Sequence, residues 1–442
     1  MSEPTQRYLE IACSNKTSDG VMSYRGGISD LIFQIPAMNS TLIPSSVRIV
    51  GKIKVFKNGA KAVVTAGHDI SMDSRLGVHS VIQSLTTKSI RHQQNIESIR
   101  HYAHFLKSYL PLSLRKEDAI GHMDEVNLNV PNWNLNKQAN VVRKDVAFTG
   151  NPFCISLPCG LLSGTRDIPL SDDTLSGLEI KLQLAPDSQV LHAVGGTIGD
   201  TDCYYELSDL KLVCEVKDYS SSEMNALKNQ GVFNYQSISS YYDTINTSNA
   251  NVMFRLGLSK VRSAFCSFVP STFLNSLNQN GYATLMPTNA TTGYLASVRK
   301  VVWDKGGMLY PKHMELNNNI RDAGSTPLCD PVLTRDYIGA VTPWAKNNST
   351  MINPMNCNRL WVGDSASSKQ TKYTEVADGG VVWGLGVSYA NSPTSLGEDF
   401  STQQFGMNVE LDLTTDHPIS AFLFVNSEQS VFFNDNGIKV VQ

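Results

Sequence analysis

Alternation of apolar and polar residues with a period of two recurs along most of this 442-residue chain. In the clearest stretch, 177–187, four apolar positions alternate with three polar ones: Leu178, Ile180, Leu182 and Leu184 against Glu179, Lys181 and Gln183. Successive side chains of a β-strand point to opposite faces, so this pattern predicts a strand in a sheet with one buried face.

Similar patterns predict many more strands, and turn residues separate them. The predicted strands are 28–36, 46–56, 205–218, 252–270 (one long or two short strands), 298–303, 308–312, 404–413, 421–425, 431–433 and 438–441. The turns are Asn58-Gly59, Asp304-Lys305-Gly306-Gly307 and Asn436-Gly437. Closely spaced strands with few helical segments are typical of all-β sandwiches.

A change of texture in the middle of the chain predicts two such sandwiches of roughly 200 residues each. Ser220 and Glu223 form the sequence pattern of a capping box, and Gly231 can close the short helix that follows. Beyond it the chain is polar up to Asn251. We therefore expect an N-terminal domain at 1–218, a connector at 219–250 and a C-terminal domain at 251–442. A short helical turn is expected at 333–341.

Composition excludes several classes of protein. The formal net charge of −3 does not favour bulk electrostatic binding of nucleic acid. The N-terminus lacks the layout of a signal peptide, and no apolar run is long enough to cross a membrane. Eight scattered cysteines without a CxxC pair indicate free, mostly buried thiols in a reducing compartment.

One helical pattern, 96–110, interrupts the strands. Asn95 is its expected N-cap and Pro111 its expected end. The apolar stripe contains Ile96, Ile99, Leu106 and Tyr109, which predicts a half-buried structural helix. His101 and His104 lie three residues apart, a spacing that can hold a metal ion, with Glu97 four residues earlier. Because no third ligand is evident and the order differs from HExxH, we interpret both histidines as lying at the polar margin, beside Arg100 and Lys107.

Other candidate chemistry is sparse, and we predict no catalytic, cofactor-binding or metal-binding residue. Asp172-Asp173 is typical of a turn before a strand. Glu410 and Asp412 share a strand face, where solvated charges are more common than the paired carboxylates of a glycosidase. Tyr235, Tyr241 and Tyr242 could stack on a sugar or base, but such residues more often anchor a segment to a neighbouring domain or subunit.

The order of several motifs resembles the double jelly-roll major capsid proteins of icosahedral double-stranded DNA viruses, especially the virophage and polinton-like group. The matching stretches are GVHSVI at 77–82, the segment 153–191, YYELSDLKLVCEVKDY at 204–219, VRSAFCSFVP at 261–270, VRKVVWDKGGMLYPKHM at 298–314 and the closing segment from 406 to 441. The resemblance spans roughly residues 25–440. It implies an all-β fold of two tandem eight-stranded jelly-roll β-sandwiches with a few short helices in connections.

The resemblance also implies a function without catalysis. Three chains would form a capsomer of pseudo-hexagonal outline that tiles an icosahedral shell around a double-stranded DNA genome, with a long loop insertion around 317–400 as an exposed tower. Expected partners are neighbouring capsomers, penton and minor or cement proteins, and an inner membrane or genome at the inner face. The expected location is the virion, assembled in the host cytoplasm or nucleus.

The residues that we expect to support this assembly are Ile96, Ile99, Leu106, Tyr109, Tyr241 and Tyr242. Leu106→Asp is expected to abolish soluble trimer, and replacement of both His101 and His104 by alanine to leave assembly intact. Two alternatives stay open: a carbohydrate-binding or carbohydrate-active tandem β-sandwich, and a minor vertex protein, although the latter usually resembles one jelly roll.

Overall fold

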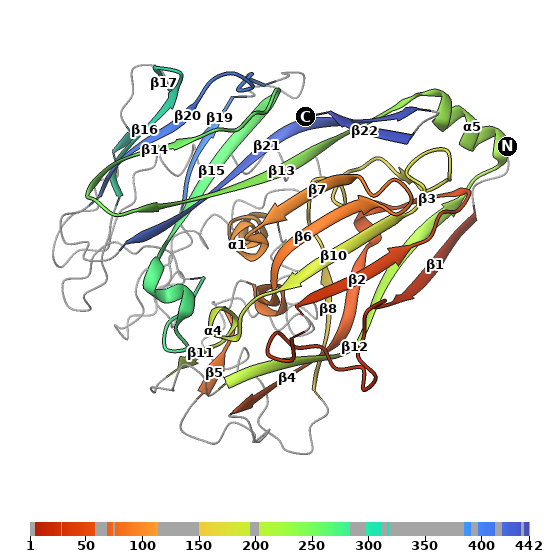
Figure 1. The fold of residues 1–442 in the computed structure, drawn as a ribbon, viewed down its shortest axis with the longest axis horizontal. Coiled ribbons are helices and arrows are strands. Elements are labelled where there is room, and N and C mark those ends of the chain that lie inside the picture. Colours follow the sequence, from red (N-terminus) through yellow and green to blue (C-terminus); the bar gives the residue numbers. More distant parts are fainter. Residues whose placement is uncertain are drawn as a thin grey trace.

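The computed structural model of the chain describes residues 5–27, 29–57, 69–73, 76–113, 150–194, 203–282, 298–310, 316–317, 384–389, 397–411, 418–434 and 437–441. These residues form mainly antiparallel sheets, arranged as two sandwiches that lie side by side along the long axis (Figure 1). Among the helices of this described part, none is long and apolar enough to cross a membrane.

The first sandwich packs a six-stranded sheet against a four-stranded sheet. The six-stranded sheet has the order β8 (Asn151–Ser156), β4 (Arg48–Lys57), β12 (Cys203–Asp218), β3 (Ser40–Leu42) and β9 (Ile168–Pro169), with β1 (Thr5–Ala12) also paired to β12. The four-stranded sheet has the order β2 (Asp30–Ile35), β10 (Leu178–Leu184), β6 (Ile82–Ser89) and β7 (Asn95–Arg100). A small ribbon of β5 (Asp69–Ser71) and β11 (His192–Val194) accompanies them.

The second sandwich consists of two five-stranded sheets. One contains β13 (Val232–Ile245), β21 (Ile419–Asn434), β15 (Val261–Pro270) and β19 (Gly384–Ser388) in this order, with β22 (Gly437–Val441) beside β21. The other contains β14 (Asn249–Phe254), β20 (Phe405–Leu411), β16 (Val298–Lys305) and β17 (Met308–Tyr310), with β18 (Leu316–Asn317) beside β16.

The described helices are short and lie in connections. They are α1 (Tyr102–Ser113), α4 (Asp187–Val190) and α5 (Ser221–Asn229), with 3₁₀ turns at Pro44–Ser46, Gly77–Val81 and Ser271–Asn275. The predicted capping box is confirmed: the Ser220 hydroxyl accepts the N–H of Glu223, and the Glu223 carboxylate accepts the N–H of Ser220.

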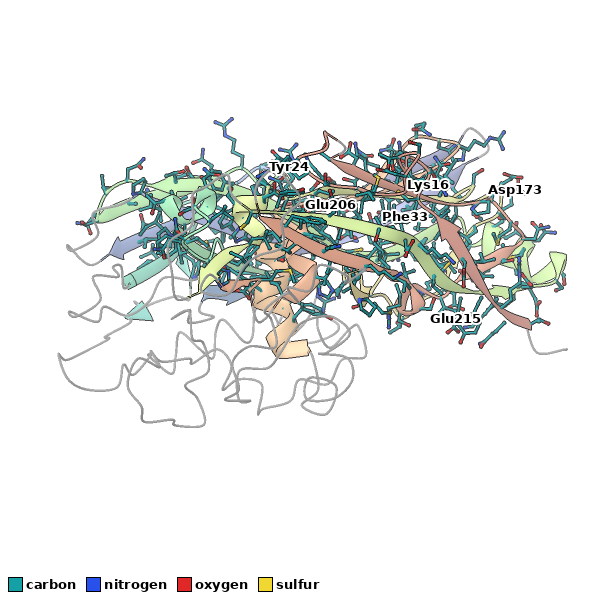
Figure 2. The ribbon with its side chains drawn as sticks, turned by 90° about the horizontal axis from the view of Figure 1, so that it is seen from below. Lys16, Tyr24, Phe33, Asp173, Glu206 and Glu215 are labelled. Carbon is teal, nitrogen blue, oxygen red and sulfur yellow. The ribbon has the colours of Figure 1, made fainter. Side chains whose placement is uncertain are left out.

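The period-two pattern places the core as predicted. Leu178, Ile180, Leu182 and Leu184 of β10 are all fully buried. Figure 2 shows Phe33 of β2 among the strands, where it is fully buried, whereas Lys16 and Asp173 lie at the exposed periphery. Gly306 and Gly307 form the predicted hairpin turn, with positive φ angles of 56° and 90° that glycine adopts without strain.

The structure decides one open prediction and corrects another. Residues 252–270 contribute to two strands, β14 and β15, which is one of the two arrangements expected from the sequence. Residues 421–425 and 431–433 belong to one strand, β21, which continues through the polar segment between them. Residues 77–81, in the first of the matching stretches, form a 3₁₀ turn, and strand β6 begins at Ile82.

The expected connector at 219–250 is mostly regular structure. It contains α5 and the whole of β13, whose 14 residues pair with β21. Its Ser, Tyr and Asn content resembles a linker because several β13 side chains stay partly exposed. Described strands before α5 belong to the first sandwich and those after it to the second, so we place the boundary at α5. The expected tower at 317–400 lies largely outside the described residues, as do the helical turn at 333–341 and the Asn58-Gly59 turn, but β19 within the tower range pairs with β15.

The two sandwiches share a continuous core. The larger apolar cluster starts in the first sandwich, passes through α1, and reaches Phe233 of β13, Phe265 of β15 and Phe424 of β21. A smaller cluster, which includes Trp303 and Phe405, fills the second sandwich. The packing at the junction therefore contributes apolar burial to both halves.

Candidate functional site at the junction of the two sandwiches

The segment predicted as one helix is a strand followed by a helix. Asn95–Arg100 forms β7, and α1 begins at Tyr102 after His101, whose φ is +55°. A bulge opposite Thr87 and Lys88 leaves Ile96 without a partner in β6. This bulge lets Ile96 and Ile99, three residues apart, both be buried in a strand, which imitates a helical period. The helix also continues past Pro111 to Ser113.

Helix α1 is buried on every side, not half-buried, because it lies between the sandwiches (Figure 1). All its residues from Tyr102 to Leu110 are buried, including Lys107. Toward the first sandwich, the Tyr102 hydroxyl donates to the carbonyl of Pro158 at 2.9 Å. Toward the second, the ring of Phe105 lies 5.7 Å from that of Phe424. The helix thus fills the space between two sheets that would otherwise expose apolar faces.

The six assembly candidates divide into three groups. Ile96, Ile99, Leu106 and Tyr109 are buried in the shared core, so they support the junction from within. Tyr241 belongs to the second sandwich, where its hydroxyl donates to the carbonyl of Leu256. Tyr242 is 47% exposed and stacks on His101 with ring centroids 5.5 Å apart.

The placement of His104 at a polar margin is wrong. His104 is 1% exposed and stacks on Phe422 of β21, with ring centroids 3.9 Å apart and an angle of 11° between the planes. Its Nε2 accepts from Nε2 of Gln189 at 3.1 Å. Burial holds the pKa of His104 well below its usual value. Replacement by alanine would leave a cavity at the junction, so we no longer expect the double alanine variant to be silent.

Glu97 connects the two sandwiches through backbone hydrogen bonds. Its Oε1 accepts the N–H of Ile238 in β13 at 2.8 Å and the N–H of Gly160 at 3.0 Å. Its Oε2 accepts the N–H of Leu161 at 2.9 Å. Burial raises the pKa of Glu97, and the donated N–H groups of Ile238, Leu161 and Gly160 oppose that rise. The carboxyl group satisfies three buried donors that would otherwise be unpaired.

Sequence reasoning missed this clamp because its parts are far apart in the chain. Gly160 is required for close approach, since a Cβ there would overlap the carbonyl oxygen of Gln236 and lie 2.7 Å from Oε1 of Glu97. Tyr235 adds a second link, because its hydroxyl donates to the carbonyl of Ile96. This anchoring role matches the prediction made for the tyrosines of 219–250. The sequence feature that could have indicated a buried role for Glu97 is its position between two isoleucines, Ile96 and Ile99.

Comparisons with known proteins identify this architecture. Neither a family model nor a curated protein matches the sequence. The chain is similar to the 3.5 Å resolution structure of the Sputnik virophage, with 10% identity over 100% of this chain and 89% of that chain, at a TM-score of 0.55. It is similar to the Faustovirus major capsid protein, with 8% identity over 98% of this chain and 91% of that chain, at a TM-score of 0.56. It is also similar to a quasi-atomic model of the PBCV-1 virus capsid, with 10% identity over 100% of this chain and 98% of that chain, at a TM-score of 0.52.

The chain has the double jelly-roll fold. The two sandwiches are its two jelly rolls, and short strands such as β9 and β18 extend their sheets beyond the expected eight strands.

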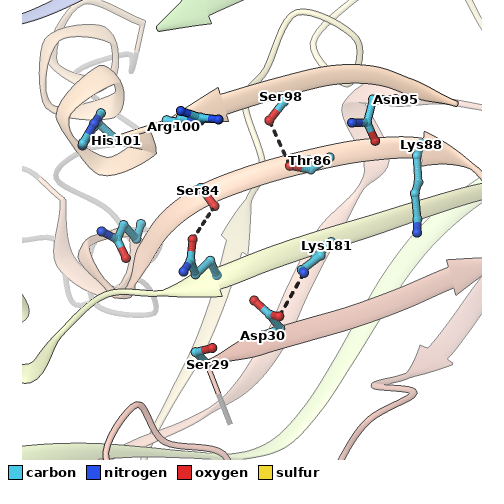
Figure 3. A pocket seen from close by; sticks show the side chains of 12 residues that line it. Ser29, Asp30, Ser84, Thr86, Lys88, Asn95, Ser98, Arg100, His101 and Lys181 are labelled. Atoms are coloured by element: carbon cyan, nitrogen blue, oxygen red, sulfur yellow. Dashed lines mark hydrogen bonds and ion pairs between the residues drawn. The ribbon is translucent and has the colours of Figure 1, made fainter. Parts of the chain in front are cut away.

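The outward face of the four-stranded sheet of the first jelly roll carries a polar hollow of about 550 Å³ (Figure 3). Hydroxyl groups pair across the strands, as between Thr86 and Ser98 at 3.1 Å. Lys181 pairs with Asp30 at 2.9 Å. Lys88, which also lines the hollow, pairs with Glu179 at 3.0 Å. Such a polar face can form hydrogen bonds with another polar surface.

The remaining candidate chemistry is structural where it is described. Asp172 lies in the turn before β10, as predicted, and accepts from the Ser176 hydroxyl at 3.0 Å. Asp412 lies outside the described residues. Within the described residues, no group of three or more His, Cys, Asp and Glu side chains could hold a metal ion. Six cysteines are free thiols, five of them buried and Cys154 half-buried, as expected, whereas Cys329 and Cys357 lie outside the described residues.

Proposed function

We propose that this chain is a major capsid protein that acts without catalysis. Three copies form a capsomer of pseudo-hexagonal outline, and capsomers tile an icosahedral shell around a double-stranded DNA genome. One observation carries the proposal: the fold matches that of the Sputnik virophage structure, the Faustovirus major capsid protein and the PBCV-1 capsid along essentially the whole chain. The sequence motifs gave the same expectation independently.

The junction supports this proposal physically. Three chains with two jelly rolls each present six jelly rolls around a threefold axis, which gives a six-cornered outline. Such a tile needs a fixed angle between the two jelly rolls of each chain, because a flexible angle would make the corners unequal. Helix α1 and the Glu97 clamp provide that rigidity, since both are buried and contact both jelly rolls.

Surface residues support contacts with further copies. Large apolar side chains that are exposed in the single chain include Tyr8, Tyr24, Met253, Met308, Leu309 and Phe432. The polar hollow adds a face that can form hydrogen bonds with a neighbour. Exposed apolar side chains of this kind become favourable when a neighbour covers them. We propose neighbouring capsomers, penton proteins and minor or cement proteins as the partners, with an inner membrane or the genome at the inner face. The protein would be located in the virion after assembly in the host cytoplasm or nucleus.

Size-exclusion chromatography with light scattering tests the proposal. The expected result is a trimer of three times the 48.5 kDa chain mass, or larger particles. A monomer that binds a glycan resin would contradict it and would favour the alternative of a carbohydrate-binding tandem sandwich.

A further inference from the structure

We propose that acidification opens the junction between the two jelly rolls, with His104 as the group that takes up the proton. This inference goes beyond the proposed function, because it concerns how the chain itself responds to pH. It rests on three basic side chains spaced three residues apart: half-buried His101, which precedes α1, and His104 and Lys107, which α1 buries inside the shared core.

His104 occupies a site suited to a neutral ring only. Its ring stacks on the ring of Phe422, and the centroid of the Tyr282 ring lies 4.9 Å from that of His104. Since Nε2 of Gln189 can only donate, Nε2 of His104 accepts and the proton of the neutral ring lies on Nδ1. Within the described parts of the chain, Nδ1 has no hydrogen-bond partner. A second proton would therefore face an amide donor at Nε2, while Nδ1–H would stay unsolvated.

Neighbouring charges on α1 oppose that second proton. Lys107 is fully buried one turn along the helix, and its Nζ donates to the carbonyl of Tyr282 at 3.4 Å. His101 lies one turn earlier, with ring centroids 6.4 Å apart, and follows Arg100. Both Lys107 and His101 lower the pKa of His104, in addition to burial.

Among the described residues, no acidic side chain on the other packed elements contacts the His104 ring as a counter-charge. Strand β21 presents Phe422, and β13 presents Tyr242 to His101. Strand β15 places the Cys266 thiol near Lys107. From α4 comes Gln189, while Asp187 on that helix accepts from Tyr205 N–H and pairs with Arg25. Behind Tyr282, the carboxylate of Asp73 accepts a hydrogen bond from the side-chain amide of Asn280. His192 of β11, the strand that follows α4, is also buried. Glu97 of β7 is held by its own three N–H donors.

The consequence is a proton-linked separation of α1 from β21. Protonated His104 is stable only in water, so the closed junction must open to accommodate it. His104 is exposed in the open state and buried in the closed state, so proton uptake favours opening. The opening equilibrium rises by about fivefold from pH 6.5 to pH 5.5 and by about tenfold for each further pH unit, until the lowered pKa of the closed state is reached.

Hydrogen exchange measured by mass spectrometry tests this on the full chain, with labelling times scaled to the intrinsic exchange rate at each pH. Peptides from α1 and from residues 419–425 of β21 report the junction, and peptides from β4 and β12 serve as internal references. Between pH 6.5 and pH 5.5, junction protection should fall by about fivefold relative to the references. In His104→Phe, which keeps the aromatic stack but binds no proton, the fall in protection should be much smaller than in the wild type, and the remainder is expected from His101, whose pKa burial also lowers.

His104→Gln gives a second neutral variant in case the phenylalanine does not fit, and His92→Gln, in the β6–β7 turn, is a histidine control that should behave like the wild type. The proposal is overturned if wild-type junction protection does not change with pH, or if both His104 variants lose protection as the wild type does. The exchange readout does not require a trimer, so failure of the capsid function and failure of this inference are distinguishable.

Discussion

Oε1 of Glu97 lies 2.8 Å from the backbone nitrogen of Ile238 and accepts its N–H, so a side chain of the first jelly roll satisfies a strand of the second. The same oxygen also accepts from Gly160, which ties the 160–161 loop to the same point. This single carboxyl group therefore determines how three segments, distant in sequence, meet at the junction. Because Glu97 is buried, its hydrogen bonds are stronger than they would be in water, and a substitution that leaves one of their groups unpaired is more costly.

Glu97→Gln should lower the free energy of unfolding by about 3 kcal/mol, because the new amide N–H₂ faces a backbone donor and leaves it unpaired. Chemical denaturation measures this change. Glu10→Gln is the matched control, since Glu10 is largely exposed and pairs with Lys211 on the surface, and it should change stability by less than about 1 kcal/mol. Equal effects of the two substitutions would argue against the clamp.

Gly160→Ala should destabilise the junction by more than about 3 kcal/mol, since the added Cβ overlaps the Gln236 carbonyl, which is backbone and cannot rotate away. Gly164→Ala in the same loop is the control, because its Cβ would lie 3.5 Å from the nearest atom, the Leu161 carbonyl oxygen, an ordinary contact. Thermal unfolding of the two variants checks the difference. A stable Gly160→Ala protein would show that the loop does not approach β13 as closely as described.

Leu106→Asp should abolish soluble trimer, as expected from the sequence, but through loss of folding. Leu106 is fully buried in α1, so the new carboxylate would lie in the shared core without a partner. Leu309→Asp is the matched control, because Leu309 is 51% exposed in β17. Soluble yield and circular dichroism separate the two, and a folded Leu106→Asp chain would contradict the position of α1.

Acid should weaken the first jelly roll through His79 as well. His79 is buried, and desolvation lowers its pKa to about 4. The unfolded chain then binds more protons than the folded chain below the ordinary histidine value of about 6.5, so stability from His79 is present above that pH and is lost as pH falls toward 4.

Comparison of wild type with His79→Gln isolates this effect, because Asp187, whose pKa burial raises to about 6, titrates in both proteins. From pH 7 to pH 5, the wild type should lose about 2 kcal/mol more than the variant in denaturant unfolding. An identical pH dependence in the two proteins would exclude a buried neutral His79.

The sequence predicts the strands well where one face is buried. β10, and β12 on either side of its irregularity at Ser208–Lys211, alternate because one of their faces is in the core, and period-two reasoning locates both. Period-two reasoning fails where the buried positions of a strand do not follow a simple alternation. β7 carries a bulge, and β13 is polar but paired along its length, so one was predicted as helix and the other as connector.

The junction was harder to predict than the strands because it depends on contacts between distant segments. The burial of Ile96, Ile99, Leu106 and Tyr109 follows from hydrophobicity alone. The burial of His104 and Lys107 does not, since β21 and Tyr282, which cover them, come from distant parts of the chain. Glu97 likewise gains its role from Gly160 and Ile238, which lie 63 and 141 residues away.

Negative-stain electron microscopy of the purified full-length protein tests the central claim most directly. The account predicts particles with a hexagonal outline and threefold symmetry in class averages, each built from three chains with two jelly rolls apiece. Single two-lobed particles that do not associate at any concentration used would contradict it.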